Sequence, residues 1–275
     1  MDIWQILMTP FSWLLKLFCQ VFNSYGIALF LFTIVIKVVL FPLNLKGKKS
    51  MIKMNVVNGQ LQEIQKRCGN DKERYNQEVQ KFYAENNANP MGGCGWSFLP
   101  IVFLYPLYAI IRRPLKYMMW LTEDTVKAVA KALGWADFTP VGTNELTLGA
   151  MMTAENLGTA KAAAGASAAS LFVINFDFFG IDLSQIPQLR FWEGGVSWNS
   201  VGLFLLPLIS AGLSVVTMLI TQKTNQMNKD QQVKMSPMLM LMSPAISLWI
   251  GFAMPAGLCI YWIANSLLGM VQEVI

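Results

Sequence analysis

Long apolar runs alternate with shorter polar stretches along the chain, and this pattern predicts helices that cross a membrane. A bilayer core about 30 Å thick requires about 20 mostly apolar residues in a helix. Five runs meet or approach that length. We therefore expect an all-α membrane protein with five transmembrane helices, over residues 24–45, 94–118, 201–221, 237–254 and 256–275.

The first 23 residues carry a helical repeat of apolar positions rather than a continuous apolar run. Apolar side chains recur from Ile3 to Phe18, and Trp4 and Trp13 stand among them. No positively charged segment precedes the apolar positions, as it would in a signal peptide. We expect residues 1–23 to form an amphipathic helix in the membrane interface.

A polar stretch, residues 46–93, separates the first two predicted spans. Its part from Lys46 to Asn89 holds nine Lys or Arg residues and five Asp or Glu residues. Two runs with helical apolar spacing flank a turn signal at Cys68–Asp71. The stretch is therefore predicted to be an antiparallel helical hairpin.

The distribution of lysines predicts the orientation of the chain. Short cytoplasmic loops are enriched in Lys and Arg. Lysines crowd both the end of the first span and the loop 222–236, which lie on the same side of the membrane if there are five spans: Lys46, Lys48, Lys49, Lys53, Lys223, Lys229 and Lys234. We expect the hairpin to be cytoplasmic, and the N-terminus and the loop 119–200 to lie outside. Arg112, Arg113 and Lys116 run against this rule.

The composition narrows the classes of function. Charged residues make up 13% of the chain and hydrophobic residues 54%, whereas soluble domains carry about 25% charged residues. The chain has no histidine and four widely separated cysteines, and it lacks a phosphate-binding G-x-x-x-x-G-K-[ST] motif. We expect no enzymatic activity, no cofactor, no metal and no nucleic-acid specificity.

Lys37 is the most informative residue, because it lies near the middle of the first predicted span. A charge near the bilayer centre costs about 2.5–3.5 kcal/mol on insertion scales. Such a residue usually faces a bundle interior or a watery cavity. The alternative is a lysine that extends toward the cytoplasmic edge near Lys46. That edge is about 13–14 Å of helix away, which favours the cavity.

Polar residues in other spans could line the same cavity. Thr33 lies one helical turn before Lys37, and hydroxyls follow helical spacing in the third span. Small hydroxyls also pack helices together, so each one alone is weak support. The predicted substrate-binding groove comprises Lys37, Thr33, Ser210, Ser214, Thr217, Tyr261, Trp262 and Asn265.

Four sequence blocks stand in a fixed order across most of the chain: Phe32–Met51, Asn89–Cys94, Phe179–Leu183 and Met254–Trp262. In this order they resemble the YidC/Oxa-type membrane protein insertases, and the chain is most similar to the short, Gram-positive-like form. The family often has Arg at the position of Lys37. An ungapped match places Pro100 where the family often has a Gln that lines the groove.

The resemblance implies five helices around a hydrophilic, positively charged groove that opens to the cytoplasm. It implies an insertase and chaperone of the bacterial plasma membrane that acts alone or with the Sec translocon. The implied partners are nascent membrane proteins as substrates, the lipid bilayer, the Sec translocon and the ribosome.

Two other classes of function stay open at the level of sequence. A small-solute transporter could use Lys37 as an anion site, and it would need a polar path through the full thickness of the membrane. A structural scaffold would tolerate neutralisation of Lys37. A membrane enzyme would need a catalytic constellation, and the predicted spans contain no histidine and no well-placed Asp or Glu.

Overall fold

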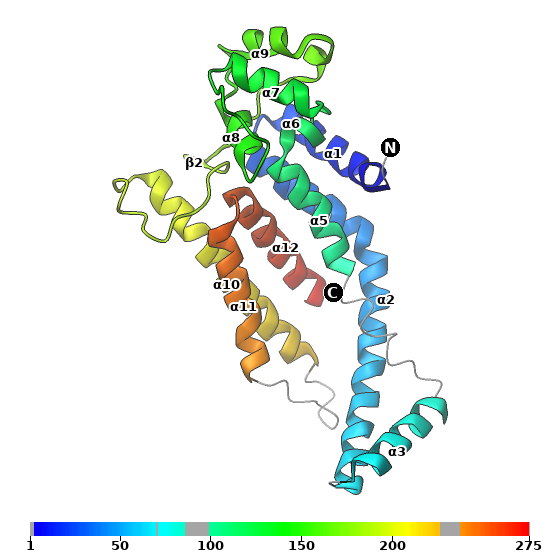
Figure 1. Ribbon diagram of the computed structural model, residues 1–275. Helices are drawn as coiled ribbons and strands as arrows, with labels where there is room; N and C mark the ends of the chain where they lie inside the picture. The colour runs from blue at the N-terminus through cyan, green and yellow to red at the C-terminus, as the bar shows by residue number, and fades with distance from the viewer. Residues whose placement is uncertain (1–2, 70, 86–98, 226–236, 275) are drawn as a thin grey trace.

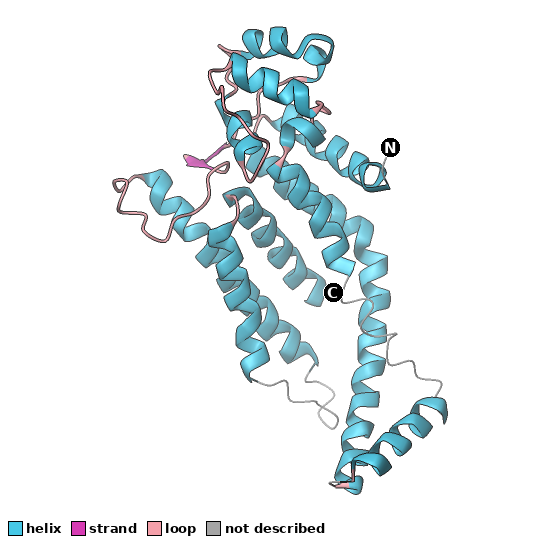
Figure 2. Ribbon diagram, viewed as in Figure 1, coloured by secondary structure: helices cyan, strands magenta, loops and turns pink. Residues whose placement is uncertain are grey.

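The computed structural model describes residues 3–69, 71–85, 99–225 and 237–274, which are mostly helical (Figures 1 and 2). The elements follow the chain in this order: α1 (Ile3–Phe22), α2 (Tyr25–Cys68), α3 (Lys72–Glu85), α5 (Leu99–Arg112), α6 (Pro114–Tyr117), α7 (Glu123–Ala132), α8 (Asn144–Met151), α9 (Leu157–Ala164), the 3₁₀ helix η2 (Gly165–Ser170), β1 (Asp177–Phe178), β2 (Ile181–Asp182), α10 (Trp198–Asn225), α11 (Pro237–Ala253) and α12 (Ala256–Val274). The sequence block Asn89–Cys94, Lys229 and Lys234 lie outside the described residues.

Three regions follow one another along the length of the molecule (Figure 1). A cap formed by residues 114–170 lies at one end, and the turn between α2 and α3 lies at the other. The bundle of α2, α5, α10, α11 and α12 lies between them. We call the two ends of the bundle the capped end and the hairpin end.

Helix α1 packs along the capped end of the bundle, where it contacts α2, α5 and α6. Met8, Phe11, Leu15 and Cys19 form a buried stripe at helical spacing. The opposite side of the helix exposes Trp13 and other apolar side chains. One face of α1 is therefore buried against the bundle, and the opposite face carries exposed apolar side chains.

Helix α2 is continuous for 44 residues, from the first predicted span through Pro42 into the polar stretch. Its length of about 66 Å is twice the thickness of a bilayer core. The polar stretch is rich in helix-forming Lys, Gln and Met, so nothing in its sequence ends the helix at residue 45. The chain turns after Gly69, which has a φ of 58°, and α3 follows in contact with α2 without burying any of its own residues.

Two of the helices within the described residues are long and apolar enough to cross a membrane, namely Tyr25–Gly47 and Trp198–Thr221. Within the other predicted spans, 94–118, 237–254 and 256–275, lie the shorter or more polar helices α5 with α6, α11 and α12, and residues 94–98 lie outside the described part of the chain. Their crossing of the membrane stays a prediction.

Close contacts at glycine hold the bundle together. A Cβ atom on Gly257 of α12 would lie 3.0 Å from the Tyr25 ring and 3.3 Å from Leu29, both on α2. Gly251 of α11 meets Pro207 of α10 in the same way, at 2.9 Å. Glycine at these positions allows the helix backbones to approach closely.

The predicted outer loop 119–200 is folded and contains several short helices. Helices α7, α8 and α9 and η2 occupy much of it. Val126, Val129, Leu146 and Leu148 are fully buried and join the same apolar core as the capped end of the bundle. The cap is therefore folded onto the bundle rather than tethered to it.

Candidate functional site: a polar cluster between α2, α10 and α12

Burial changes along α2 at the position of Thr33. Tyr25, Leu29, Phe32 and Thr33 are at most 1% exposed. Every residue from 34 to 46 is at least partly exposed. The helix is therefore tightly packed at the capped end and loosely packed toward the hairpin end.

Helix α12, which contacts both α2 and α10, shows the same change, and so does α10. In α12, residues 256–260 are all buried, whereas none of residues 267–273 is buried. In α10, the last buried residue before position 222 is Ala211. Three neighbouring helices thus pack closely at the capped end and leave their side chains accessible in the half that faces the hairpin end.

Lys37 lies where this accessible half begins, and its ammonium group faces α12. A Cβ atom on Gly269 would lie 3.8 Å from Lys37 Nζ and 3.8 Å from Thr217 Cγ2 of α10. Two of the predicted groove residues, Lys37 and Thr217, therefore both lie next to one glycine. A larger side chain at position 269 would occupy the space that both now share.

Thr217 also links α10 directly to α12. Its hydroxyl is 2.8 Å from the carbonyl oxygen of Leu213 in its own helix and 3.4 Å from that of Ser266 in α12. A hydroxyl has a single proton to donate, so the two carbonyls share or exchange it. The second contact ties the polar cluster to the backbone of α12.

Two other hydroxyl residues of the predicted groove are oriented along their own helices. Thr33 donates to the carbonyl of Leu29 at 2.7 Å, and Ser214 donates to that of Ser210 at 3.0 Å. The Ser210 hydroxyl is fully buried and has no hydrogen-bond partner among the described residues. Thr33 and Ser210 therefore lie in the packed half, on the capped side of Lys37.

The α12 residues of the predicted groove are partly exposed. Asn265 precedes Gly269 by four residues and Trp262 precedes it by seven, so both lie on the face of α12 that carries Gly269. Tyr261 is rotated by about 80° from that face, at 100° per residue. Two of the three predicted α12 residues therefore share the face of Gly269, and their place in a substrate groove stays a prediction.

The sequence analysis did not include two polar residues that extend the cluster toward the hairpin end. Asn44 follows Lys37 by seven residues on α2, and Gln272 follows Gly269 by three on α12. With Phe41 and Leu45 they line a cavity of about 10 Å³, which is about the space that one water molecule needs. The spacing from Lys37 to Asn44 was the available signal, since positions seven apart share a helix face.

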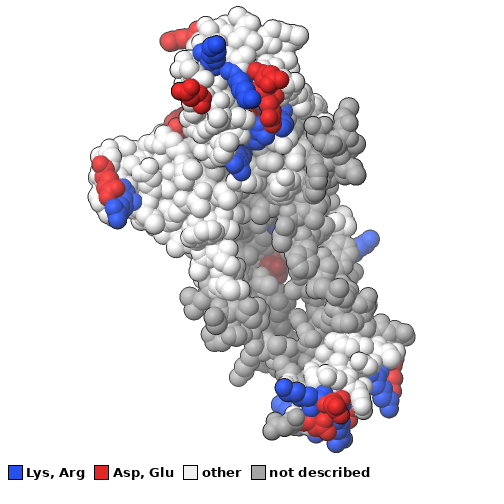
Figure 3. All heavy atoms as spheres, viewed as in Figure 1, with Lys and Arg blue, Asp and Glu red and all other residues white. Residues whose placement is uncertain are grey.

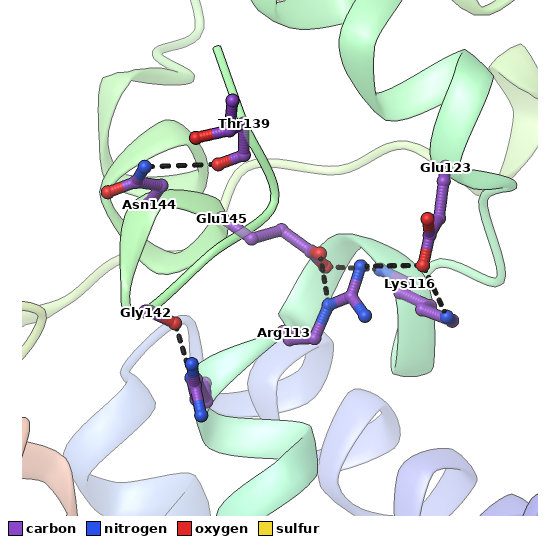
Figure 4. Close-up of polar contacts among 8 residues, drawn as sticks. Arg113, Lys116, Glu123, Thr139, Gly142, Asn144 and Glu145 are labelled. Atoms are coloured by element: carbon purple, nitrogen blue, oxygen red, sulfur yellow. Dashed lines mark hydrogen bonds and ion pairs between the residues drawn. The ribbon is translucent and has the colours of Figure 1, made fainter.

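The basic residues that run against the positive-inside rule have acidic or carbonyl partners in the cap (Figure 4). Arg113 Nε is 2.9 Å from Glu145 Oε2, and Arg113 and Lys116 both contact Glu123, at 3.2 and 2.9 Å. Arg112 donates to the carbonyl of Gly142. Acidic groups of the cap thus pair with Arg113 and Lys116, and Figure 3 shows charges of both signs close together in the cap.

Glu145 is the buried member of this network. It is 1% exposed and also accepts a hydrogen bond from the backbone N–H of Lys116 at 2.6 Å. Burial raises the pKa of the Glu145 carboxyl, against the opposing effect of its hydrogen bonds with Lys116 and Arg113. The hydrogen bonds of exposed Glu123 with Lys116 and Arg113 lower its pKa. Among the described residues, no group of three or more Cys, Asp or Glu side chains could hold a metal ion.

The sequence of residues 17–275 matches the family described as "60Kd inner membrane protein". The chain belongs to this family, the YidC/Oxa family. The resemblance carried by the four sequence blocks is therefore confirmed.

Curated members of the YidC/Oxa family named "Membrane protein insertase YidC" match the chain. The protein from Dechloromonas aromatica is 26% identical over 269 residues, which is 98% of this chain and 35% of the relative. The protein from Methylococcus capsulatus is 25% identical over 268 residues, with the same coverage. The protein from Haemophilus influenzae is 37% identical over 99 residues, which is 36% of this chain and 18% of the relative. The chain spans about a third of the length of the relatives that it matches along its whole length.

Proposed function

We propose that this protein is a membrane protein insertase of the bacterial inner membrane, and that the polar cluster around Lys37 receives the hydrophilic parts of its substrates. Membership of the YidC/Oxa family and the names of its relatives support the activity. The position of Lys37 beside Thr217 and Gly269, in the accessible half of three helices, supports the role of the cluster.

The cluster would act by lowering the barrier to crossing rather than by a chemical step. An ammonium group in a water-accessible space attracts acidic segments of a chain that must cross. Hydroxyl, amide and carbonyl groups around it would keep polar segments hydrogen-bonded inside the membrane, where unsatisfied groups are costly. The apolar part of the substrate could meanwhile enter the lipid. Neither catalysis nor a cofactor is required.

The proposed direction of access is from the cytoplasm. In this arrangement, the bundle contains five spans and the helical hairpin of α2 and α3 is cytoplasmic. The N-terminus and the cap are then outside. The lysine distribution supports this orientation. Arg113 and Lys116, which run against it, are paired with Glu145 and Glu123 of the cap.

Transport of a small solute is less well supported. It would require a polar path through the whole bundle. The capped ends of α2 and α12 are instead filled by buried, mostly apolar side chains such as Leu29, Phe32 and Cys259. That packing is consistent with a space that opens toward one end only.

The test is an insertion assay with the full chain purified and reconstituted in liposomes, without ATP and without the Sec translocon. The substrate is a small single-span protein with a short acidic external tail. Wild type is expected to insert it, Lys37→Arg to retain most of the activity, and Lys37→Ala to lose it. Lys46→Ala is the matched control, because Lys46 lies on the same helix and is exposed.

Each outcome has a defined meaning. Equal insertion by wild type and Lys37→Ala would reduce Lys37 to a tolerated charge while leaving the insertase activity in place. Absence of insertion by wild type until the Sec translocon is added would make the protein a partner of that channel. Addition of ribosome-bound nascent chains in a further arm tests whether ribosomes deliver the substrate.

A further inference from the structure

The segment that links the cap to α10 exposes large apolar side chains, although other side chains of the segment pack against the bundle. Phe179, Leu189, Trp192, Val196 and Trp198 are each between 58% and 77% exposed. The segment projects sideways from the capped end of the bundle, below the cap, and continues directly into α10 (Figure 1). Large side chains on such a surface mark an interaction site rather than ordinary scatter.

Other side chains of the same segment fix it to the bundle. A Cβ atom on Gly202 of α10 would lie 2.5 Å from Ile181, and one on Gly26 of α2 would lie 2.3 Å from the Phe178 ring. The rings of Phe191 and Phe204 have centroids 4.8 Å apart. One set of side chains in the segment is therefore packed against the bundle, and the other set is largely exposed.

The backbone is strained at the most exposed of these residues. Phe179 has a φ of 54°, a value that bulky residues rarely adopt. Its carbonyl accepts a hydrogen bond of 2.7 Å from Trp198 Nε1, which fixes the turn. The strained backbone leaves the phenyl ring of Phe179 77% exposed. This exposure would bring no benefit in water, whereas backbone strain of this kind clusters at functional sites.

Along the bundle, the segment lies at the same level as the first residues of both candidate membrane spans. The span on α10 begins at Trp198, and the span on α2 begins at Tyr25. The backbone N–H of Tyr25 donates to the carbonyl of Asn175 at 2.9 Å, so both span ends adjoin this segment. Tryptophan is enriched at the level of the lipid headgroups.

We propose that Phe179, Leu189, Trp192, Val196 and Trp198 form a lipid-contact surface that lies in the headgroup layer at the capped end of the protein. Its partner is the bilayer leaflet at that end, continuous with the lipid-facing side of α10. Between Phe179 and Trp198 the charged residues are Asp182, Arg190 and Glu193, and Arg190 pairs with Glu193 at 3.0 Å. Apolar burial, and not attraction to anionic lipid, therefore drives the contact.

This surface would set the depth of the polar cluster in the membrane. The same segment supplies the carbonyls of Gln185 and Leu183, which accept hydrogen bonds from Ala256 and Gly257 at the start of α12, at 2.9 and 3.1 Å. It also leads into the first turn of α10. The surface would thus hold the two helices that carry Thr217 and Gly269 at a fixed height. The inference rests on the membrane placement of α10 and not on insertase activity, so either can fail alone.

The experiment measures the surroundings of single spin labels on the full chain in liposomes. All four cysteines are replaced by alanine, and labels are placed at Trp192→Cys and Val196→Cys. Lys127→Cys in the cap is the water reference, and Val216→Cys, 44% exposed in α10, is the lipid reference. Accessibility to oxygen, which partitions into lipid, is compared with accessibility to a water-soluble nickel chelate.

We expect an oxygen-to-nickel ratio at positions 192 and 196 that lies between the two references, roughly threefold or more above Lys127→Cys. The ratio is expected to be equal in zwitterionic vesicles and in vesicles that also contain an anionic phospholipid. A ratio equal to that of Lys127→Cys would overturn the proposal. Protection from both reagents would also overturn it, because a protein would then cover the surface.

A second measurement tests the anchoring itself and does not need labels on the surface. The label is moved to Leu205→Cys on α10, and Trp192 and Val196 are both replaced by serine. Loss of the anchor is expected to shift this label toward the nickel reagent. An unchanged ratio in a variant whose thermal unfolding matches the parent would contradict the role in setting depth.

Discussion

The ammonium nitrogen of Lys37 lies beside Gly269, where a Cβ atom on the glycine would be only 3.8 Å away. The charge of one helix therefore faces a place on another helix that has no side chain. Lys37 stands out in the sequence because it is a charge within an apolar run, whereas Gly269 does not stand out. It also gives a way to perturb the cluster without removing its charge.

We predict that Gly269→Leu lowers insertion as strongly as Lys37→Ala, because the leucine would fill the space next to the ammonium group. Gly269→Ala is the matched control, since 3.8 Å is an ordinary contact distance for the added carbon. Alanine within a helix should add about 0.5–1 kcal/mol of stability relative to glycine. The assay is insertion in liposomes, with thermal unfolding in detergent as the check on folding. Full activity of Gly269→Leu would show that the space is not used.

Glu145 should contribute more to stability than Glu123, although both contact Arg113. Glu145 is buried, whereas Glu123 is about half exposed. Breaking a buried ion pair costs about 3–5 kcal/mol, because a charge is left unpaired, whereas an exposed pair is screened by water and contributes little. We expect Glu145→Gln to lower the midpoint of thermal unfolding clearly and Glu123→Gln to change it little. Equal effects would mean that Arg113 is adequately paired by either carboxylate.

The two glutamates should give opposite dependence of stability on pH. Burial raises the folded-state pKa of Glu145, so its contribution is fully present below the ordinary Glu pKa and is lost as pH rises through the folded-state value. The folded-state pKa of Glu123 is lowered, so its contribution is present above the ordinary pKa and is lost as pH falls. The measurement is the midpoint of thermal unfolding across the acidic pH range. The loss of stability with rising pH should be absent in Glu145→Gln, and the loss of stability with falling pH should be absent in Glu123→Gln.

The positions of the main helices could be predicted from the sequence because their signal is local. A run of about 20 apolar residues is sufficient to indicate a span, and α10 and the first part of α2 follow the predicted runs. The continuity of α2 past residue 45 was not apparent, because hydropathy changes there while helix propensity does not. The packing of the cap was not apparent either, since its core combines α7 and α8 with residues far away in sequence.

The candidate site was predictable only where a residue is unusual for its surroundings. Lys37 is conspicuous because a charge in a span is costly. Gly269 and Asn44 are ordinary residues for a helix, and only the parallel packing of α2 against α12 gives them a place in the cluster. The hydrogen bonds that direct Thr33 and Ser214 along their own helices also depend on side-chain rotamers, which periodicity does not specify.

The contact between Gly26 and Phe178 gives a final prediction about how the capped end is closed. A Cβ atom at position 26 would lie 2.3 Å from the Phe178 ring, too close for any real contact. Gly26→Ala must therefore displace the ring or separate α2 from the β1 segment, and overpacking of this kind costs about 1–3 kcal/mol. Gly212→Ala in α10 is the control, because nothing lies within 4 Å of its added carbon. We expect a lower unfolding midpoint in detergent for Gly26→Ala and an equal or higher one for Gly212→Ala. If Gly26→Ala is as stable as wild type, the ring can move away without loss, and the close contact is not needed to hold the capped end together.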